Sequence, residues 1–302
     1  MQSLWMLLAA FFFAGMGVCV KIASAWFNSA ELMLWRGLIS VLLLWVLARA
    51  QRVPLATPYP AMHAWRSLVG SVSLGAWFYA IAGLPLATAM TLNYMSSVWI
   101  AVFIVGGALV AWRPRSGERV PLGQAPLLIT VLAGFAGVVM LLQPTMQENQ
   151  LFAGLVGLFS GITAALAYMQ VMVLGRLGEP ELRTVFYFAV GSVVAGAVAL
   201  PFTGMAPWDS WQWQHGLWLL PIGALATGGQ LCMTRAYSKG ATLVVANLQY
   251  SGIVFGALFG MVLFAERITP LGWMGMLLIT ASGIAATALR TRAAPDSPAE
   301  EH

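Results

Sequence analysis

One uncharged run, from Ala241 to Phe264, limits the fold of this chain more than any other feature of the sequence. A helix of about 20 apolar residues spans the hydrocarbon core of a lipid bilayer, so this run predicts a membrane-spanning helix. Gly252, Gly256 and Gly260 recur at every fourth position and form a smooth stripe on such a helix. Small residues let helix backbones approach closely in a membrane, so we expect the stripe to pack against another helix.

The same run carries a polar face that points away from the glycines. Asn247, Tyr250 and Ser251 are spaced so that they share one side of the helix. A polar face is unfavourable in lipid unless it meets protein or water. We therefore expect this face to line a cavity inside the protein.

This run has a counterpart earlier in the chain, from Ala87 to Val110. With an offset of 154 positions the two stretches align without a gap, so that Ser97 pairs with Ser251 and Arg113 with Arg267. Self-similarity over such a distance predicts a duplicated unit of about 150 residues. The function is expected where the two halves meet.

Composition places the chain in a membrane. Of its 302 residues, 60% are hydrophobic and only 8% are charged, and the mean hydropathy of +0.82 is too high for a soluble domain. The net charge of +5 does not indicate nucleic-acid binding, because the basic residues stand singly at the ends of apolar runs. Cys19 and Cys232 lie in apolar segments, and His63, His215 and His302 lack ligand spacing. We therefore expect no metal site and no cofactor.

The apolar runs predict an all-α membrane protein with ten transmembrane helices. The first five-helix repeat is expected over residues 1–145, the second over 146–290, and a disordered cytoplasmic tail over 291–302. The predicted spans are Leu4–Val20, Leu32–Leu47, Trp65–Ile81, Ala87–Val110, Leu122–Leu142, Leu151–Leu174, Leu182–Leu200, Leu217–Ala236, Ala241–Phe264 and Leu271–Leu289.

The distribution of basic residues predicts the orientation. If the N-terminus is cytoplasmic, every Lys and Arg except Lys21, Arg36 and Arg267 falls on the cytoplasmic side. Cytoplasmic loops carry an excess of Lys and Arg, so both termini are predicted to be cytoplasmic. Because each half has five spans, the second half must enter the membrane from the opposite side. The duplication is therefore an inverted repeat, which is the architecture of alternating-access carriers.

Several short motifs identify a family. The five-plus-five arrangement, the Ala-Thr-Ala opening at 87–89 and the Phe264–Pro270 junction resemble the drug/metabolite transporter superfamily in its EamA branch. The resemblance implies a carrier of small metabolites in the bacterial inner membrane, and its members often export amino acids. The runs at Ala30–Gly37 and Leu92–Tyr94 resemble carriers for S-adenosylmethionine uptake. Ser96-Ser97 and Ser251-Gly252 depart from the family, in which a proline commonly interrupts the fourth helix.

The candidate substrate-binding residues are polar, aromatic or charged side chains within the apolar runs, where a carrier recognises its solute. Ser73 and Thr227 occupy equivalent positions of the two repeats, as a pseudo-symmetric cavity requires. The candidates are Arg36 of the second run, Ser73 and Trp77 of the third, Asn93, Tyr94 and Ser97 of the fourth, Tyr168 of the sixth, Thr227 and Gln230 of the eighth, and Asn247 and Tyr250 of the ninth.

These residues also have structural interpretations, which the sequence leaves open. Ser and Thr in membrane helices often bond to their own backbone, and Trp77 and Tyr250 are large enough to serve only in packing. Arg36 lies inside the second run, where a charge is costly. Its long side chain either extends to the outer surface or meets a solute carboxylate or a partner acid.

The function expected from these residues is secondary transport of a small polar or amphipathic metabolite, such as an amino acid or a derivative. The predicted partners are this solute and the lipid bilayer, with no nucleic acid, and the sequence does not predict an oligomeric state. No Asp or Glu lies inside a predicted span, which argues against a carboxylate proton relay and against an intramembrane enzyme. The alternatives are a carrier for S-adenosylmethionine or a nucleoside-like metabolite, and a non-transporting scaffold or lipid-binding protein.

Overall fold

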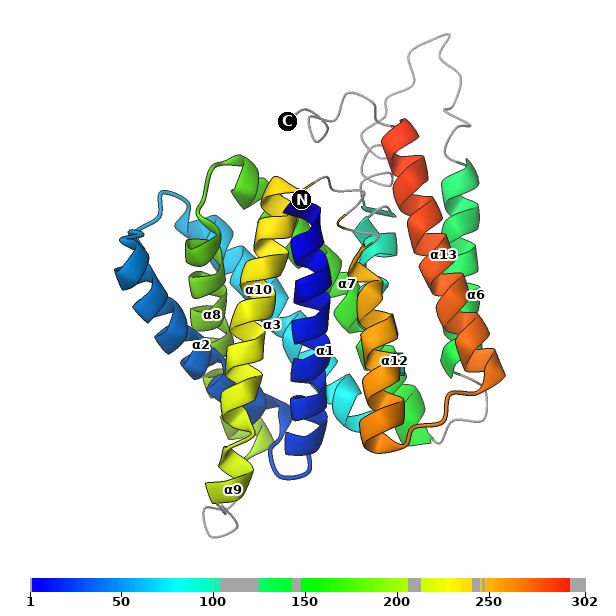
Figure 1. The fold of residues 1–302 in the computed structure, drawn as a ribbon, viewed down its shortest axis with the longest axis horizontal. Helices are drawn as coiled ribbons and strands as arrows, with labels where there is room; N and C mark the ends of the chain where they lie inside the picture. The colour runs from blue at the N-terminus through cyan, green and yellow to red at the C-terminus, as the bar shows by residue number, and fades with distance from the viewer. Residues whose placement is uncertain are drawn as a thin grey trace.

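The computed structural model describes residues 2–100, 102–103, 125–142, 148–205, 213–240, 245 and 248–293. The regular secondary structure within these residues is entirely helical, and the described part of each predicted run overlaps a helix (Figure 1). The elements are η1 (Gln2–Leu4), α1 (Trp5–Ala23), α2 (Ser29–Gln51), α3 (Pro60–Gly83), α4 (Leu86–Tyr94), α6 (Ala125–Leu142), α7 (Glu148–Arg176), α8 (Glu181–Thr203), α9 (Trp213–Gly216), α10 (Leu219–Lys239), α12 (Ser251–Phe264) and α13 (Pro270–Ala293).

Local sequence signals set several helix ends. Asn28 caps α2, because its side chain accepts hydrogen bonds from the backbone N–H groups of Ala30 and Glu31, while the Glu31 carboxylate accepts one from the Asn28 N–H. A proline occupies the first turn of α3, where its missing N–H costs nothing. Ala265 ends α12 in the left-handed conformation, with φ of 51°. These signals place the helix ends near the predicted boundaries.

Length and hydropathy identify the helices that cross the membrane. Within the described residues, five helices are long and apolar enough to span it, and two shorter apolar helices accompany them. Large apolar side chains such as Leu42, Phe202 and Val262 are exposed on the outside of the bundle, as expected for surfaces that face lipid. The long spans are Trp5–Ala23, Ser29–Gln51, Gln150–Arg176, Glu181–Thr203 and Gln214–Lys239, and the short helices are Ser251–Phe264 and Pro270–Ala285.

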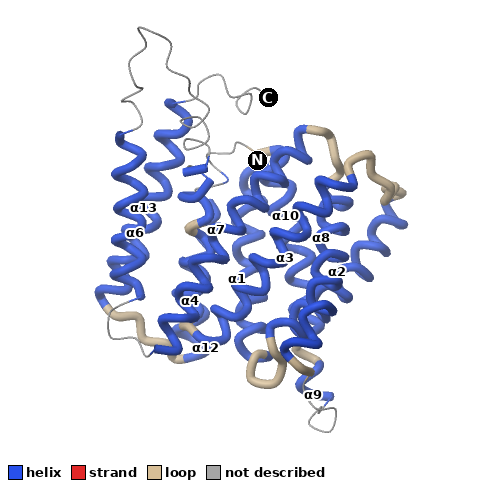
Figure 2. Tube along the Cα trace, turned by 180° about the vertical axis from the view of Figure 1, so that it is seen from behind, coloured by secondary structure: helices blue, strands red, loops and turns tan. Residues whose placement is uncertain are grey.

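Helix contacts repeat with the symmetry of an inverted duplication. The α1–α10 contact has its counterpart in α7–α3, the α2–α10 contact in α8–α3, and the α1–α12 contact in α7–α4. The equivalent helices α2 and α8 pack on each other, as do α6 and α13. Figures 1 and 2 show the α6–α13 pair at one edge of the bundle, and α1 starts at the end of the bundle where α13 finishes. The predicted fold class, two inverted five-helix repeats, is confirmed.

Two of the predicted spans, Ala87–Val110 and Ala241–Phe264, are interrupted. The helix α4 ends at Tyr94, a turn follows at Met95, and helical structure resumes over 96–100. In the second repeat a turn at Tyr250 precedes α12. The two interruptions are joined, because the Gln249 amide donates a hydrogen bond of 3.2 Å to the Ser96 hydroxyl. Broken backbone is tolerated at membrane depth where it lies inside protein, and Gln249 is fully buried.

The glycine stripe packs closely, although against side chains rather than against a helix backbone. A methyl group on Gly252 would collide with the Tyr94 ring, and one on Gly256 would collide with Met90. A contact with backbone occurs instead at Gly161 of α7, next to the Leu92 carbonyl. The helix α4 is therefore held between α7 and α12 by small residues on both sides.

Ion pairs link loops and helix ends at the two ends of the bundle. Where α1 ends, the Lys21 ammonium lies 2.8 Å from the Glu266 carboxylate, which also accepts a hydrogen bond from the Leu86 N–H at 2.9 Å. At the opposite end, the Glu179 carboxylate contacts His63 at 3.1 Å and Arg183 at 3.0 Å. Both acids lie outside the predicted spans, as the sequence indicated.

Candidate functional site

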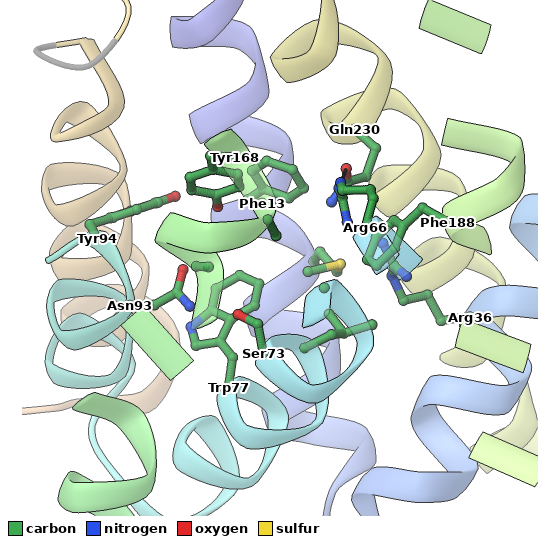
Figure 3. A pocket seen from close by; sticks show the side chains of 15 residues that line it. Phe13, Arg36, Arg66, Ser73, Trp77, Asn93, Tyr94, Tyr168, Phe188 and Gln230 are labelled. Atoms are coloured by element: carbon green, nitrogen blue, oxygen red, sulfur yellow. Dashed lines mark hydrogen bonds between the residues drawn. The ribbon is translucent and has the colours of Figure 1, made fainter. Parts of the chain in front are cut away.

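Seven of the predicted residues line one cavity within the helix bundle (Figure 3). The lining comes from α1, α2, α3 and α4 of the first half and from α7, α8 and α10 of the second. The cavity is therefore built by both repeats, as expected of a carrier. The seven residues are Arg36, Ser73, Trp77, Asn93, Tyr94, Tyr168 and Gln230.

Arg36 of α2 is buried with an exposure of 1%. Its Nη1 donates a hydrogen bond of 3.3 Å to the Ser192 hydroxyl, and its guanidinium lies 5.1 Å from the centre of the Phe188 ring. Its Nε has no hydrogen-bond partner. The side chain does not extend to the outer surface, so the first of the two interpretations of Arg36 is wrong. The Arg36 side chain instead lies inside the protein, where it lines the cavity.

The sequence does not mark Arg66 of α3 as a functional candidate, because a basic residue near the end of an apolar run also fits a topology signal. Arg66 is 2% exposed, and its guanidinium lies 4.1 Å from the centre of the same Phe188 ring. Its Nη2 donates a long hydrogen bond of 3.5 Å to the Gln230 carbonyl oxygen, while Nε and Nη1 have no partner. Ser73 and Trp77 follow Arg66 by seven and eleven residues, so all three lie on one face of the helix. This periodicity is the sequence signal that could identify Arg66 as a cavity residue.

The part of the cavity away from the arginines combines polar groups with aromatic surface. The Asn93 amide donates to the Ser160 hydroxyl at 3.0 Å, and the Ser73 hydroxyl donates to the Ser160 carbonyl at 2.9 Å. The Trp77 indole N–H and the Tyr94 hydroxyl are buried and have no hydrogen-bond partner. In Figure 3 these side chains lie on the opposite side of the cavity from Arg36. The cavity therefore has a cationic end and an aromatic, polar end.

Contacts between aromatic rings hold the side chains at the aromatic, polar end of the cavity. Phe13 of α1 contacts Trp77 edge-on, with ring centres 6.4 Å apart. Tyr168 of α7 stacks on Tyr237 of α10, with ring centres 5.5 Å apart. Such contacts hold aromatic side chains in fixed positions, which suits a surface that receives a flat or apolar part of a ligand.

Three predicted residues lie outside the cavity lining, and a fourth cannot be placed. The Thr227 hydroxyl donates to the Gly223 carbonyl at 2.8 Å and bonds to the Ser40 hydroxyl at 2.9 Å. The Tyr250 hydroxyl lies against Gly283 of α13, and Ser97 is buried outside the lining. Thr227 does not mirror Ser73 in a symmetric cavity, because it faces α2. Asn247 lies outside the described residues.

No cluster of three or more His, Cys, Asp or Glu side chains that could hold a metal ion occurs in the described part of the chain. Cys19 and Cys232 are buried and free. The lining residues supply hydrogen-bond donors, positive charge and aromatic surface. Such an arrangement can recognise a solute by contact.

Comparison with known proteins finds relatives over nearly the whole chain. Residues 155–287 match the EamA-like transporter family. A pseudopaline exporter of Pseudomonas aeruginosa is 34% identical over 92% of this chain and 93% of that protein. A riboflavin transporter of Rhizobium johnstonii is 26% identical over 93% of this chain and 89% of that protein. A solved crystal structure that is 17% identical shares the fold, with a TM-score of 0.66 over 95% of this chain and 98% of that chain.

Proposed function

Because the chain belongs to the EamA-like transporter family, we propose that it carries a small polar or amphipathic metabolite by alternating access between its two repeats. The chain is a multi-pass membrane transporter and not an enzyme. The proposed membrane is the bacterial inner membrane, with both termini in the cytoplasm, and the proposed repeats occupy residues 1–145 and 146–290. The solute class that we propose is an amino acid or a derivative of one.

The observation that carries this proposal is the cavity lined by both repeats. A carrier needs a site that two halves of the protein can expose in turn to either side of the membrane. The lining residues Asn93 of α4 and Gln230 of α10 come from different repeats and reach the same space. Rocking of the repeats about this space would change which end is open. The Lys21–Glu266 ion pair lies at helix ends, outside the cavity lining.

Relatives differ in the solute that their names give, so no single substrate transfers to this chain. One is named an exporter of pseudopaline and another a transporter of riboflavin. The cavity of this chain combines polar groups with aromatic surface, and we propose that it accepts organic metabolites with both polar and flat parts. The aromatic side chains of Phe13, Trp77 and Tyr168, which line the cavity, support this preference.

Counterflow in proteoliposomes tests the proposal with radiolabelled amino acids as the probes. The wild-type protein should accumulate at least one labelled amino acid when the vesicles hold the unlabelled compound. Asn93→Ala and Gln230→Ala should lower this flux about tenfold or more, because each removes a polar contact in the cavity. Gln51→Ala is the control, since Gln51 is exposed at the end of α2. Flux no greater than in protein-free vesicles would contradict the proposal, as would unchanged flux in both cavity variants.

A further inference from the structure

Two buried arginine side chains contact the same aromatic ring inside the helix bundle. The guanidinium groups of Arg36 and Arg66 lie 5.1 Å and 4.1 Å from the centre of the Phe188 ring and line the same cavity. The three side chains come from α2, α3 and α8, so both repeats contribute. Figure 3 shows Phe188 between the two arginines, with Gln230 beside Arg66.

Among the residues that the structure describes, neither arginine has the anionic partner that a buried charge requires. The ion pairs formed within the described residues involve Lys21, Arg183, Lys239 and His63. The contacts of Arg36 and Arg66 are instead with neutral groups at 3.3 Å and 3.5 Å, and with the face of Phe188. A buried charge without a partner is strongly destabilising, and two like charges at one ring repel each other. A ligand that neutralised both would remove this cost.

In the described part of the chain, every unpaired polar atom of the side chains that line the cavity is a hydrogen-bond donor. These atoms are Nε of Arg36, Nε and Nη1 of Arg66, the indole N–H of Trp77 and the hydroxyl of Tyr94. Buried donors are normally paired, and the tyrosine hydroxyl is the single member of this set that can also accept. The cavity is therefore complementary to a ligand that is rich in acceptor oxygens.

Resting on the transport function proposed above, we infer that Arg36 and Arg66 form an anion subsite that binds a carboxylate group of the solute. Arginine matches the two oxygens of a carboxylate in a planar, bidentate arrangement. The aromatic end of the cavity, at Phe13 and Trp77, then receives the apolar part of the same molecule. The substrate class is an amphipathic organic acid that carries a carboxylate at one end.

A thermal-shift experiment on the purified full-length protein tests this subsite with matched acids and amides. The probes are L-phenylalanine, 3-phenylpropionate and glutarate, each compared with its amide. At least one acid should raise the melting temperature while its amide does not. Arg36→Gln and Arg66→Gln should weaken the apparent affinity for that acid about 10- to 100-fold, the loss expected for a charge-assisted hydrogen bond.

Arg49→Gln is the matched control for both variants. Arg49 lies on α2 with Arg36 and also contacts an aromatic ring, at 5.4 Å from the centre of Trp45, but it is exposed. The acid-dependent shift should remain in this variant. The inference is overturned if amides stabilise as well as acids, if no acid of the set stabilises, or if the shift survives in both cavity variants. Counterflow of a neutral solute in the same protein would then preserve the transport proposal.

A second measurement separates ligand binding from a purely structural role of the arginines. Arg36→Met and Arg66→Met remove an unpaired buried charge and keep much of the side-chain volume. Without any added probe, these variants should melt at or above the wild-type temperature and should show no acid-dependent shift. A fall of several degrees in both would show that the arginines serve the fold, and it would overturn the subsite.

Discussion

Single residues decide how the cationic end of the cavity is arranged. Arg66 folds back along its own helix over Gly70, and a methyl group at Gly70 would overlap both its Nη1 and the Phe188 ring. The absence of a side chain at this position therefore makes room for the guanidinium. Since Arg36 contacts the same ring, a change at Gly70 also affects the surroundings of Arg36.

Gly70→Ala should weaken binding of the organic acid about tenfold, although both arginines remain in the chain. The added methyl group displaces the Arg66 guanidinium from its position beside the Phe188 ring, so that the hydrogen-bond donors of Arg66 no longer reach the bound carboxylate. Titration of the acid-dependent melting temperature measures this change. Gly15→Ala is the control, because a methyl group there meets Leu225 at an ordinary contact distance of 3.5 Å. Equal affinity in the wild-type protein and the Gly70 variant would contradict this account.

At the scale of the elements, the interruptions in the fourth and ninth spans are held together by one buried amide. Gln249 accepts a hydrogen bond of 2.6 Å from the Tyr237 hydroxyl and donates one of 3.2 Å to Ser96. It thereby connects α10 with the broken parts of both repeats. Backbone groups freed by a helix break need such fixed surroundings inside a membrane.

Gln249→Leu should lower the free energy of unfolding by about 1–3 kcal/mol, because it leaves the Tyr237 and Ser96 hydroxyls without this partner. Unfolding followed by circular dichroism in mixed detergent micelles measures the change. Gln170→Leu provides the comparison, since the carbonyl oxygen of Gln170 is buried without a partner, and its loss should be neutral or stabilising. Equal destabilisation by both substitutions would show that the amide network does not hold the breaks.

How far the sequence predicts this protein depends on the scale of the question. Hydropathy and the duplication predict the helices and their inverted arrangement, because every span must bury its backbone polar groups within a helix. The breaks at Met95 and Tyr250 escape prediction because no proline marks them. Arg66 was misassigned because a basic residue near the end of an apolar run also fits a topology signal. Thr227 was assigned to a cavity because repeat equivalence does not fix which neighbour a side chain meets.

At the scale of the whole molecule, the two repeats share a cavity while separate contacts join elements at each end. Lys21 and Glu266 join α1 to the α12–α13 connection at one end, and Glu179 joins α3 to the α7–α8 connection at the other. The cavity residues of α2, α3 and α8 lie between these two sets of contacts. Alternating access requires that each set can separate while the other remains closed.

Accessibility of a cysteine in the cavity tests this account most directly. Ser73→Cys is placed in a Cys19→Ala, Cys232→Ala background, because both native cysteines are buried and free. A membrane-impermeant maleimide is then added to one side or the other of oriented vesicles. The account predicts labelling of residue 73 from either side, at rates that change when the transported solute is added. Labelling from one side alone, whatever solute is present, would contradict a cavity that opens alternately between the two repeats.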